Sequence, residues 1–320
     1  MKTKNNSKQE PVQPISQSAT APAYHTTVLL KEAVDALELK ATGVYVDCTF
    51  GGGGHSREIL SRLGKDGVLI AFDQDEDAGR NLPEDERIIF VPQNFRHLQR
   101  FLRLHKHPQV DGILADLGVS SYQFDEAERG FSTRFDAALD MRMDNRAGKT
   151  AATVLKDYSE LQLHKLFEKY GEVTNAKTLA KTIVEQRSIA PFNSISRFKQ
   201  AVQPVVKGNP NKYFAQVFQA LRIEVNDEMG ALKDLLEQTV ACLKPGGRIA
   251  VISFHSLEDR MVKNFFRQGT IEEVEADDVF GTRPVSPLQV ITKKPITASP
   301  GEVKNNSRSR SAKLRVAQKK

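Results

Sequence analysis

The chain of 320 residues contains no tryptophan and only two cysteines, Cys48 and Cys242. Two cysteines cannot form a disulfide framework or a cysteine-rich zinc site. His105 and His107 stand apart from other metal-binding residue types, so we expect no metal site. No apolar run approaches the 18 residues of a membrane span, and the first residues lack the apolar stretch of a secretory signal. We therefore expect a cytoplasmic protein that does not enter membranes.

Charge is unevenly distributed along the chain. Forty-six Lys and Arg residues against 40 Asp and Glu residues give a formal net charge of +6. The segment 304–320 contains no acidic residue and seven basic ones, Lys304, Arg308, Arg310, Lys313, Arg315, Lys319 and Lys320. A basic tail fits a polyanionic partner, and it fits equally well a tail that only improves solubility. Residues 1–23, rich in Ser, Gln, Pro and Ala, are expected to form a disordered leader.

Short apolar runs alternate with helical patterns from about residue 24 onward. These runs predict strands over 43–47, 68–73, 87–92, 110–116 and 248–254. Continuous apolar runs are typical of parallel strands that are buried on both faces. We therefore expect an α/β fold with a doubly wound parallel sheet.

The connection between the fourth and fifth predicted strands is much longer than the roughly 30 residues of a βαβ unit. Ser159 and Gln162 have the spacing of a capping box at the start of a helix that Gly171 closes. Further helices are expected over 174–187 and 194–203. We expect a small helical domain for substrate recognition at 124–210, inserted into a sheet domain made of 24–123 and 211–303. Residues 213–243 should form the crossover helix back to the sheet, interrupted near Gly230.

Four consecutive glycines, Gly51 to Gly54, follow the first predicted strand and precede a helix. Such a loop lets the backbone approach a ligand closely. The dinucleotide fingerprint GxGxxG is not met, because Ser56 stands where its third glycine would be. This favours an adenosyl group without phosphates over a dinucleotide. Asp73 ends the second predicted strand, where a carboxylate accepts hydrogen bonds from ribose hydroxyls.

Residues 243–247 have the composition of a sharp turn before the fifth predicted strand. With the glycine loop and Asp73, this turn resembles class I S-adenosylmethionine-dependent methyltransferases, which implies a Rossmann-like sheet. Longer strings make the resemblance specific: YHTTVLL at 24–30, DCTFGGGGHS at 47–56, DLGVSS at 116–121, ERGFS at 128–132, LDMRMD at 139–144, FQALRIEVN at 218–226, VISFHSLEDR at 251–260 and NSRSRSAKLR at 306–315. In this order they resemble the ribosomal RNA small subunit methyltransferase H family, the 16S rRNA cytosine-N4 methyltransferases. Tyr122 and Ser307 depart from the family, which has proline at both places.

The resemblance implies S-adenosyl-L-methionine as the cofactor. It implies cofactor contacts at Gly53, Gly54, His55, Asp73, Phe95, Asp116 and Gln123. It also implies N4-methylation of a specific cytidine in the decoding region of 16S rRNA, with the rRNA or the small ribosomal subunit as partner. Asp116 is the candidate catalytic residue, because it ends the fourth predicted strand, where open parallel sheets bind their ligands. We expect a monomer or a weak homodimer.

Contacts to RNA are expected from the helical insert, from the basic tail and from Arg129, Arg142 and Arg222, although each arginine fits a structural ion pair equally well. His255 is a weaker candidate for the site. It precedes Ser256 and Asp259, which have the spacing of a helix-capping pair.

Two other functions remain open from the sequence. The first is a nicotinamide-dependent oxidoreductase on a similar sheet, which the missing third glycine argues against. The second is an RNA-binding protein without catalytic activity, which the intact glycine loop and Asp73 argue against.

Overall fold

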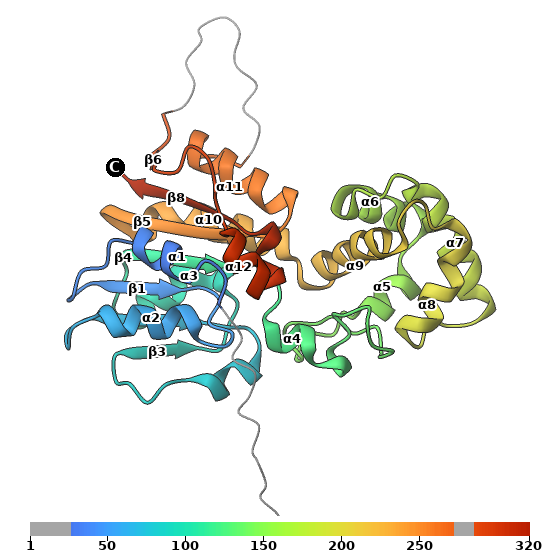
Figure 1. The fold of residues 1–320 in the computed structure, drawn as a ribbon, viewed down its shortest axis with the longest axis horizontal. Helices are drawn as coiled ribbons and strands as arrows, with labels where there is room; N and C mark the ends of the chain where they lie inside the picture. The colour runs from blue at the N-terminus through green and yellow to red at the C-terminus, as the bar shows by residue number, and fades with distance from the viewer. Residues whose placement is uncertain (1–26, 272–284) are drawn as a thin grey trace, which may run out of the picture.

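The computed structural model of the chain describes residues 27–271 and 285–320. Figure 1 shows two lobes, a sheet flanked by helices and a smaller group of helices beside it. The expected leader, 1–23, lies outside the described residues. Within the two described ranges, no helix is both long and apolar enough to cross a bilayer.

The five predicted strands are present and form a parallel sheet in the order β3-β2-β1-β4-β5. Their bounds are β1 Val44–Asp47, β2 Val68–Phe72, β3 Ile88–Val91, β4 Val110–Asp116 and β5 Leu243–Ser253. The chain begins in the middle of the sheet and winds outward in both directions, so the strand order reverses between β1 and β4. Such a switch point leaves a crevice at the carboxyl ends of the strands. The predicted Rossmann-like fold is confirmed.

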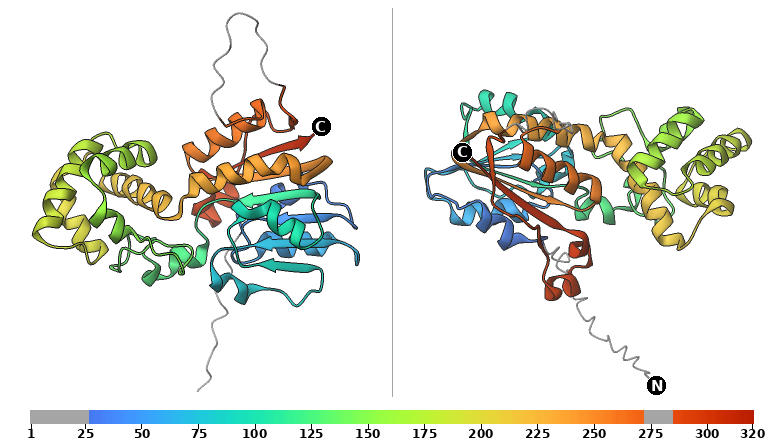
Figure 2. Two further views of the ribbon diagram at one scale, coloured as in Figure 1. Left: turned by 180° about the vertical axis from the view of Figure 1, so that it is seen from behind. Right: turned by 90° about the horizontal axis from the view of Figure 1, so that it is seen from above.

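Helices cover both faces of the sheet, as the rear and top views in Figure 2 show. One face packs against α1 Leu30–Ala36 and α2 Gly54–Arg62. The other packs against α3 Leu98–Leu104, α10 Glu228–Cys242 and α11 Ser256–Gln268. Successive strand residues serve opposite faces: in β2, Leu69 belongs to the first core and Ile70 to the second, and neither is exposed to solvent. The continuous apolar runs in the sequence arise from this burial on both sides.

The start of β5 differs from the expected turn at 243–247. Those residues belong to the strand, whose pairing with β4 shifts register between Val110 and Gly112. Gly246 has a φ of 78°, a backbone conformation that favours glycine. The Pro-Gly-Gly sequence therefore produces a bulged strand entry, which local turn propensity alone does not distinguish from a turn.

Residues 304–320 do not form the expected tail. They follow the short strands β6 Leu288–Val290 and β7 Ile296–Thr297, and they contain the end of α12 Pro300–Asn305, the 3₁₀ turn η5 Ser307–Ser311 and the strand β8 Lys313–Lys319. β8 lies antiparallel between β5 and β6. Leu314 and Val316 are fully buried in it. Within β8, basic and apolar residues alternate with the period of two that a strand requires. Counting only the basic residues does not reveal this pattern.

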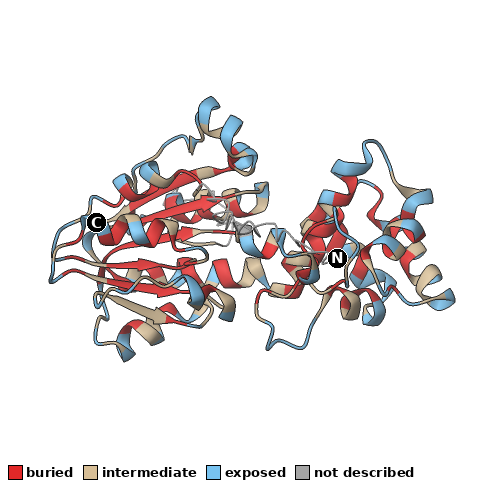
Figure 3. Ribbon diagram, turned by 60° about the horizontal axis from the view of Figure 1, so that its bottom comes forward, coloured by how far each residue is buried: buried red, intermediate tan, exposed pale blue. Residues whose placement is uncertain are grey.

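The helical lobe has its own hydrophobic core, which is visible as red inner faces in Figure 3. Its helices are α5 Ala151–Asp157, α6 Glu160–Gly171, α7 Ala176–Ile189, α8 Ile195–Val202 and α9 Pro210–Asn226. The predicted capping box is present, since the Ser159 hydroxyl accepts a hydrogen bond from the Gln162 amide. The left-handed residue after α6 is Glu172, with a φ of 50°, one position beyond the expected Gly171. Short elements at the lobe junction and along the sheet edge are α4 Ser121–Asp125, η1 Glu76–Asn81, η2 Phe95–His97 and η3 Ala127–Arg129. The turn η4 Gln203–Val205 follows α8 within the helical lobe.

The helical lobe extends further along the chain than the expected boundary at residue 210. The apolar face of α9, from Tyr213 to Val225, packs into the core of the helical lobe and not against the sheet. The expected crossover helix is two helices, because Asp227 adopts a left-handed φ of 48° between α9 and α10. The break lies at Asp227 and not at the expected Gly230. In the sequence the glycine indicated a break, and this aspartate did not.

We predict that β8 is essential for the stability of the sheet lobe. Replacing the buried Leu314 by alanine should lower the free energy of unfolding by about 2–5 kcal/mol, because the smaller side chain leaves a cavity between the surrounding strands. Urea denaturation followed by circular dichroism measures this. The matched control is Arg310→Ala, which removes an exposed basic residue from the same segment and should leave the midpoint unchanged. Equal midpoints for the two variants would mean that β8 does not contribute to the fold.

Candidate functional site

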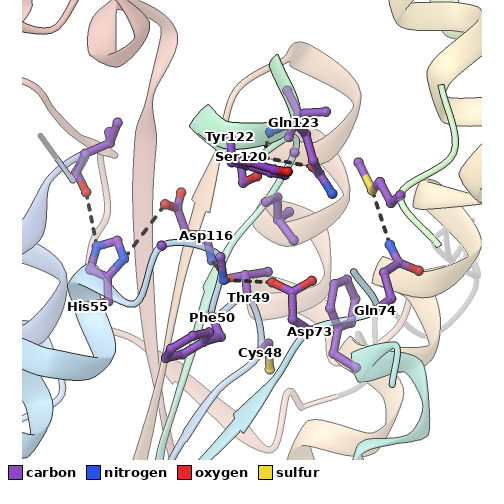
Figure 4. Close-up of a pocket in the computed structure, with 18 of the residues that line it drawn as sticks. Cys48, Thr49, Phe50, His55, Asp73, Gln74, Asp116, Ser120, Tyr122 and Gln123 are labelled. Atoms are coloured by element: carbon purple, nitrogen blue, oxygen red, sulfur yellow. Dashed lines mark hydrogen bonds and ion pairs between the residues drawn. The ribbon is translucent and has the colours of Figure 1, made fainter. Parts of the chain in front are cut away.

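A cavity of about 650 Å³ lies at the carboxyl ends of the parallel strands. Figure 4 shows side chains from the loops after β1, β2 and β4 pointing into it. Residues of the junction between α9 and α10 and one residue of the C-terminal segment, Arg308, complete the wall. The cavity thus occupies the crevice that the sheet topology predicts, and it borders the helical lobe.

The glycine loop connects β1 to α2 and forms one side of the cavity. Gly51 and Gly53 have φ values of 49° and 74°, which favour glycine. A Cβ atom on Gly54 would lie 1.9 Å from the Thr27 hydroxyl, so no side chain fits there. At Gly52, by contrast, a Cβ would meet nothing within 4 Å. The loop therefore presents bare backbone to an open space, as a close ligand requires.

The buried carboxyl of Asp47 holds this loop in place. It accepts a hydrogen bond from the Thr49 amide at 3.0 Å and one from the Ser56 hydroxyl at 2.7 Å. Ser56 is fully buried. The residue that breaks the dinucleotide fingerprint therefore ties the first turn of α2 to the end of β1.

Asp73 follows β2 and lines the cavity. Its two carboxylate oxygens accept hydrogen bonds from the amides of Gly51 at 2.7 Å and Asp75 at 2.8 Å. Burial raises the pKa of Asp73 to about 6; the two amide hydrogen bonds lower it, and the neighbouring carboxyls of Asp75 and Asp47 raise it further. The side chain thus fixes the glycine loop and remains at the cavity wall.

Asp116 ends β4, and its backbone amide donates to the Thr49 hydroxyl at 2.7 Å. Its Oδ1 atom is buried and has no hydrogen-bond partner. Burial raises the pKa of Asp116 well above its usual range, and the carboxyls of Asp47 and Glu258 raise it further. A buried acceptor without a partner is costly, and this makes Asp116 a candidate ligand-binding group.

His55, in the first turn of α2, faces Asp116. Its Nδ1 lies 3.8 Å from Asp116 Oδ2, and its Nε2 lies 3.1 Å from the carbonyl oxygen of Val28. The imidazole is only 4% exposed, and burial lowers its pKa, while the carboxyl of Asp47 and the Val28 carbonyl act in the opposite direction. The ring is therefore neutral at pH 7.

Gln123 and Phe95 also line the cavity. The Gln123 side chain is bonded within the protein: its amide donates to Asp75 at 2.7 Å, and its oxygen accepts from the Ser120 backbone at 3.1 Å. Phe95 begins η2, the next element after β3, and is only partly buried. Six of the seven residues expected at the cofactor are thus brought to one cavity. The seventh, Gly53, lies just behind the wall, at the N-cap of α2.

The three arginines expected at the RNA are already engaged in the protein. Arg129 is 8% exposed; it lies 2.8 Å from Asp75 and donates to two backbone carbonyls. Arg142 pairs with Asp140, and Arg222 with Glu228 through two hydrogen bonds. The structure therefore supports ion pairing within the protein for these three residues, the alternative that the sequence left open. These arginines lie next to carboxylates only because of the tertiary fold, so their spacing in the sequence does not predict the ion pairs.

His255 caps α11, in place of the expected pair Ser256 and Asp259. Its Nδ1 accepts the Glu258 amide, and Glu258 in turn accepts the amides of Phe254 and His255. Asp259 instead binds Arg315 of β8 at 2.6 Å.

Glu228, His255 and Glu258 are the one trio of metal-binding side chains that lie within 4.8 Å of each other in the described parts of the chain. Both carboxylates already have partners: Glu228 pairs with Arg222, and Glu258 accepts hydrogen bonds from backbone amides. Sequence reasoning did not find Glu228 or Glu258 as wall residues, because they come from two helices that only the fold brings together.

Arg308 is a further wall residue that sequence reasoning did not single out. Its guanidinium binds Asp125 at 2.5 Å and lies 5.1 Å from the centre of the Phe124 ring. The basic segment thus reaches across the sheet lobe to α4, beside the cavity.

Sequence comparisons with known proteins give matches over nearly the whole chain. The profile of the MraW methylase family matches residues 22–320. A protein of Bacteroides thetaiotaomicron named ribosomal RNA small subunit methyltransferase H is 53% identical over 93% of this chain and 98% of its own length. Proteins of the same name from Christiangramia forsetii and Flavobacterium johnsoniae are each 52% identical, over 92% and 94% of this chain and 98% and 99% of their own.

We predict that Asp73 makes the stability of the fold depend on pH. Folding raises its pKa from 3.8 to about 6, so the folded chain holds this proton more tightly than the unfolded chain. The resulting stabilisation is full below about pH 4 and is lost as the pH rises through 6. Relative to Asp73→Asn, which cannot titrate, the wild type should lose up to about 3 kcal/mol of unfolding free energy between pH 4 and 7. If the difference in unfolding free energy between the wild type and Asp73→Asn stays constant across this pH range, the raised pKa of Asp73 is refuted.

Proposed function

The chain belongs to the MraW methylase family, and we propose that it transfers a methyl group from S-adenosyl-L-methionine to N4 of a specific cytidine in the decoding region of 16S rRNA. The observation that carries this proposal is the 53% identity, over nearly the whole length of both chains, to a ribosomal RNA small subunit methyltransferase H. The cavity at the switch point of the sheet adds independent support, since its wall has the groups that an adenosyl cofactor needs.

The cavity wall fits S-adenosylmethionine in its chemistry. Gly52 offers open space next to bare backbone, which suits the methionine portion beside Gly53 and Gly54. Asp73 would accept the ribose hydroxyls, and Phe95 would pack on the adenine. The unpartnered Asp116 Oδ1 marks a place for a hydrogen-bond donor, either the cofactor's ammonium or the amine of the base. Gln123 and His55 complete the set of contacts that we propose.

The chemistry assigns distinct tasks to the cofactor and to the protein. S-adenosylmethionine would supply a methyl group bound to a positively charged sulfur. This sulfur is a good leaving group and needs no assistance from the protein. The protein must orient the cytosine amine, whose lone pair is delocalised into the ring, and it must receive the proton that the amine loses. Asp116 is the acidic side chain we assign to this, because it lies on the cavity wall and has an unsatisfied oxygen.

The target base has to leave its stack to enter the cavity. The cavity borders the helical lobe, which we propose as the surface that recognises the substrate, either the rRNA or the small ribosomal subunit. Because Arg129, Arg142 and Arg222 are engaged inside the protein, we assign the electrostatic contact to the exposed basic residues of the C-terminal segment, Lys304 and Arg310. We propose that the protein acts as a monomer or a weak homodimer.

The direct test is methyl transfer from labelled S-adenosylmethionine to 16S rRNA, followed by mass spectrometry of the nucleosides. We predict N4-methylcytidine as the product, and its loss from rRNA of cells that lack the protein. A methyl group on cytosine C5 or on another base would refute the proposed N4 specificity. Binding of nicotinamide dinucleotide in place of S-adenosylmethionine, or RNA binding without any methyl transfer, would support the two alternative functions.

We predict that Asp116→Asn separates two roles of this carboxyl. The substitution keeps the shape and removes the negative charge. We expect both roles, with cofactor binding dominant. To the extent that Asp116 holds the cofactor's ammonium, affinity measured by calorimetry should fall, and saturating cofactor should restore much of the rate. If it orients the amine and takes its proton, affinity should persist and single-turnover methylation should fall by roughly 10²–10⁴-fold. Normal affinity with a normal saturated rate would exclude both roles.

A further inference from the structure

The imidazole of His55 is held in one tautomer by its surroundings. The Val28 carbonyl, 3.1 Å from Nε2, can only accept a hydrogen bond, so Nε2 carries the proton. Because burial keeps the ring neutral, Nδ1 presents a lone pair. That lone pair faces Oδ2 of Asp116 at 3.8 Å. Figure 4 shows the side chains of His55 and Asp116 pointing toward each other.

Two acceptors that face each other leave room for one proton between them. A carboxylate oxygen and an imidazole lone pair repel one another in a buried site, where water does not screen them. The His55 side chain is 4% exposed and that of Asp116 is 23% exposed. The distance of 3.8 Å is longer than a hydrogen bond, and a modest rotation of either side chain shortens it, as often happens when a catalytic site binds its ligand.

The charged groups around this pair make it a good proton acceptor. Asp47 at the end of β1 acts on both members, and Glu258 of α11 acts on Asp116. Both neighbours are carboxyls, and both favour a bound proton on the pair.

We propose that His55 and Asp116 form a two-residue proton acceptor, in which Asp116 Oδ2 takes the proton from the methylated amine and shares it with His55 Nδ1. This inference rests on the proposed N4-methylation. The amine nitrogen forms its bond to the methyl carbon as the carbon–sulfur bond breaks, and the electron pair of that bond stays on sulfur. The nitrogen then loses one proton, which moves to the gap between Oδ2 and Nδ1. The positive charge that leaves the sulfur thus ends on the carboxyl–imidazole pair, which Asp47 and Glu258 stabilise.

His55 is in this account a positioning residue that raises the basicity of Asp116, beyond its expected contact with the cofactor. The free protein provides a test that needs neither cofactor nor RNA. Nitrogen-15 NMR of the histidine rings should show His55 as the Nε2–H tautomer, with an Nδ1 resonance that shifts when Asp116 is replaced by asparagine. The proposed pair would be refuted if the Nδ1 chemical shift stays the same in the Asp116→Asn variant. It would also be refuted if His55 carries its proton on Nδ1 and not on Nε2.

The second test uses His55→Gln, which can retain the hydrogen bond to Val28 and removes Nδ1. The saturated single-turnover rate should fall at least about 10-fold, in the direction expected for a weaker base. The acid limb of its pH profile should move to lower pH, because Asp116 loses the partner that favours its protonated form. Because His55 is also a proposed cofactor contact, the rates are compared at cofactor concentrations that saturate each variant. The melting temperature should stay the same. His105→Gln, which lies outside the cavity wall, is the matched control.

The outcomes distinguish this inference from the proposed function. A lower rate with an unmoved acid limb would assign His55 a structural or cofactor-binding role only, and the proton-acceptor pair would be refuted. Absence of N4-methylcytidine with the wild-type protein would refute the proposed function, while the NMR test of the pair in the free protein would still give its answer.

Discussion

The buried carboxyl of Asp47 is the constraint on which the site depends. It has no exposed surface, and it ties the end of β1 to the glycine loop through Thr49 and to α2 through Ser56. With the loop fixed, the Gly51 amide can donate to Asp73. The same carboxyl acts electrostatically on Asp73, Asp116 and His55. One side chain behind the cavity thus holds the shape of its floor and, after burial, adds to the raised pKa values of Asp73 and Asp116.

The sequence predicted those parts of the fold that local patterns determine. The runs that form β1 to β4, the glycine loop and the capping box at Ser159 each show their periodicity or residue type within a few positions. Six of the seven residues expected at the cofactor line one cavity, because strand ends of a parallel sheet meet at one edge. The resemblance to a known family supplied Phe95 and Gln123, which no spacing rule would have selected.

The parts that could not be predicted depend on tertiary contacts. Whether Arg129 faces RNA or Asp75 depends on the packing between lobes, and the residue type is the same in both cases. The assignment of α9 to the helical lobe depends on which core its apolar face meets. The partnership of His55 with Asp116 needs the carbonyl of Val28 behind the ring. Each of these contacts joins residues that are distant in sequence, so their local sequence carries no sign of them.

The position of β8 has a consequence for how the protein is made. The core of the helical lobe is drawn from residues 131–225 and can close as soon as α9 has been synthesised. The sheet lobe cannot, since β5 stays without its antiparallel neighbour until residues 313–319 have left the ribosome. During that interval the edge of β5 has unpaired backbone N–H and C=O groups, the kind of surface that pairs with other chains. The inserted lobe is therefore complete while its host is still unfinished, and the nascent chain passes through a stage in which the helical lobe is folded but the methyl-transfer lobe is not.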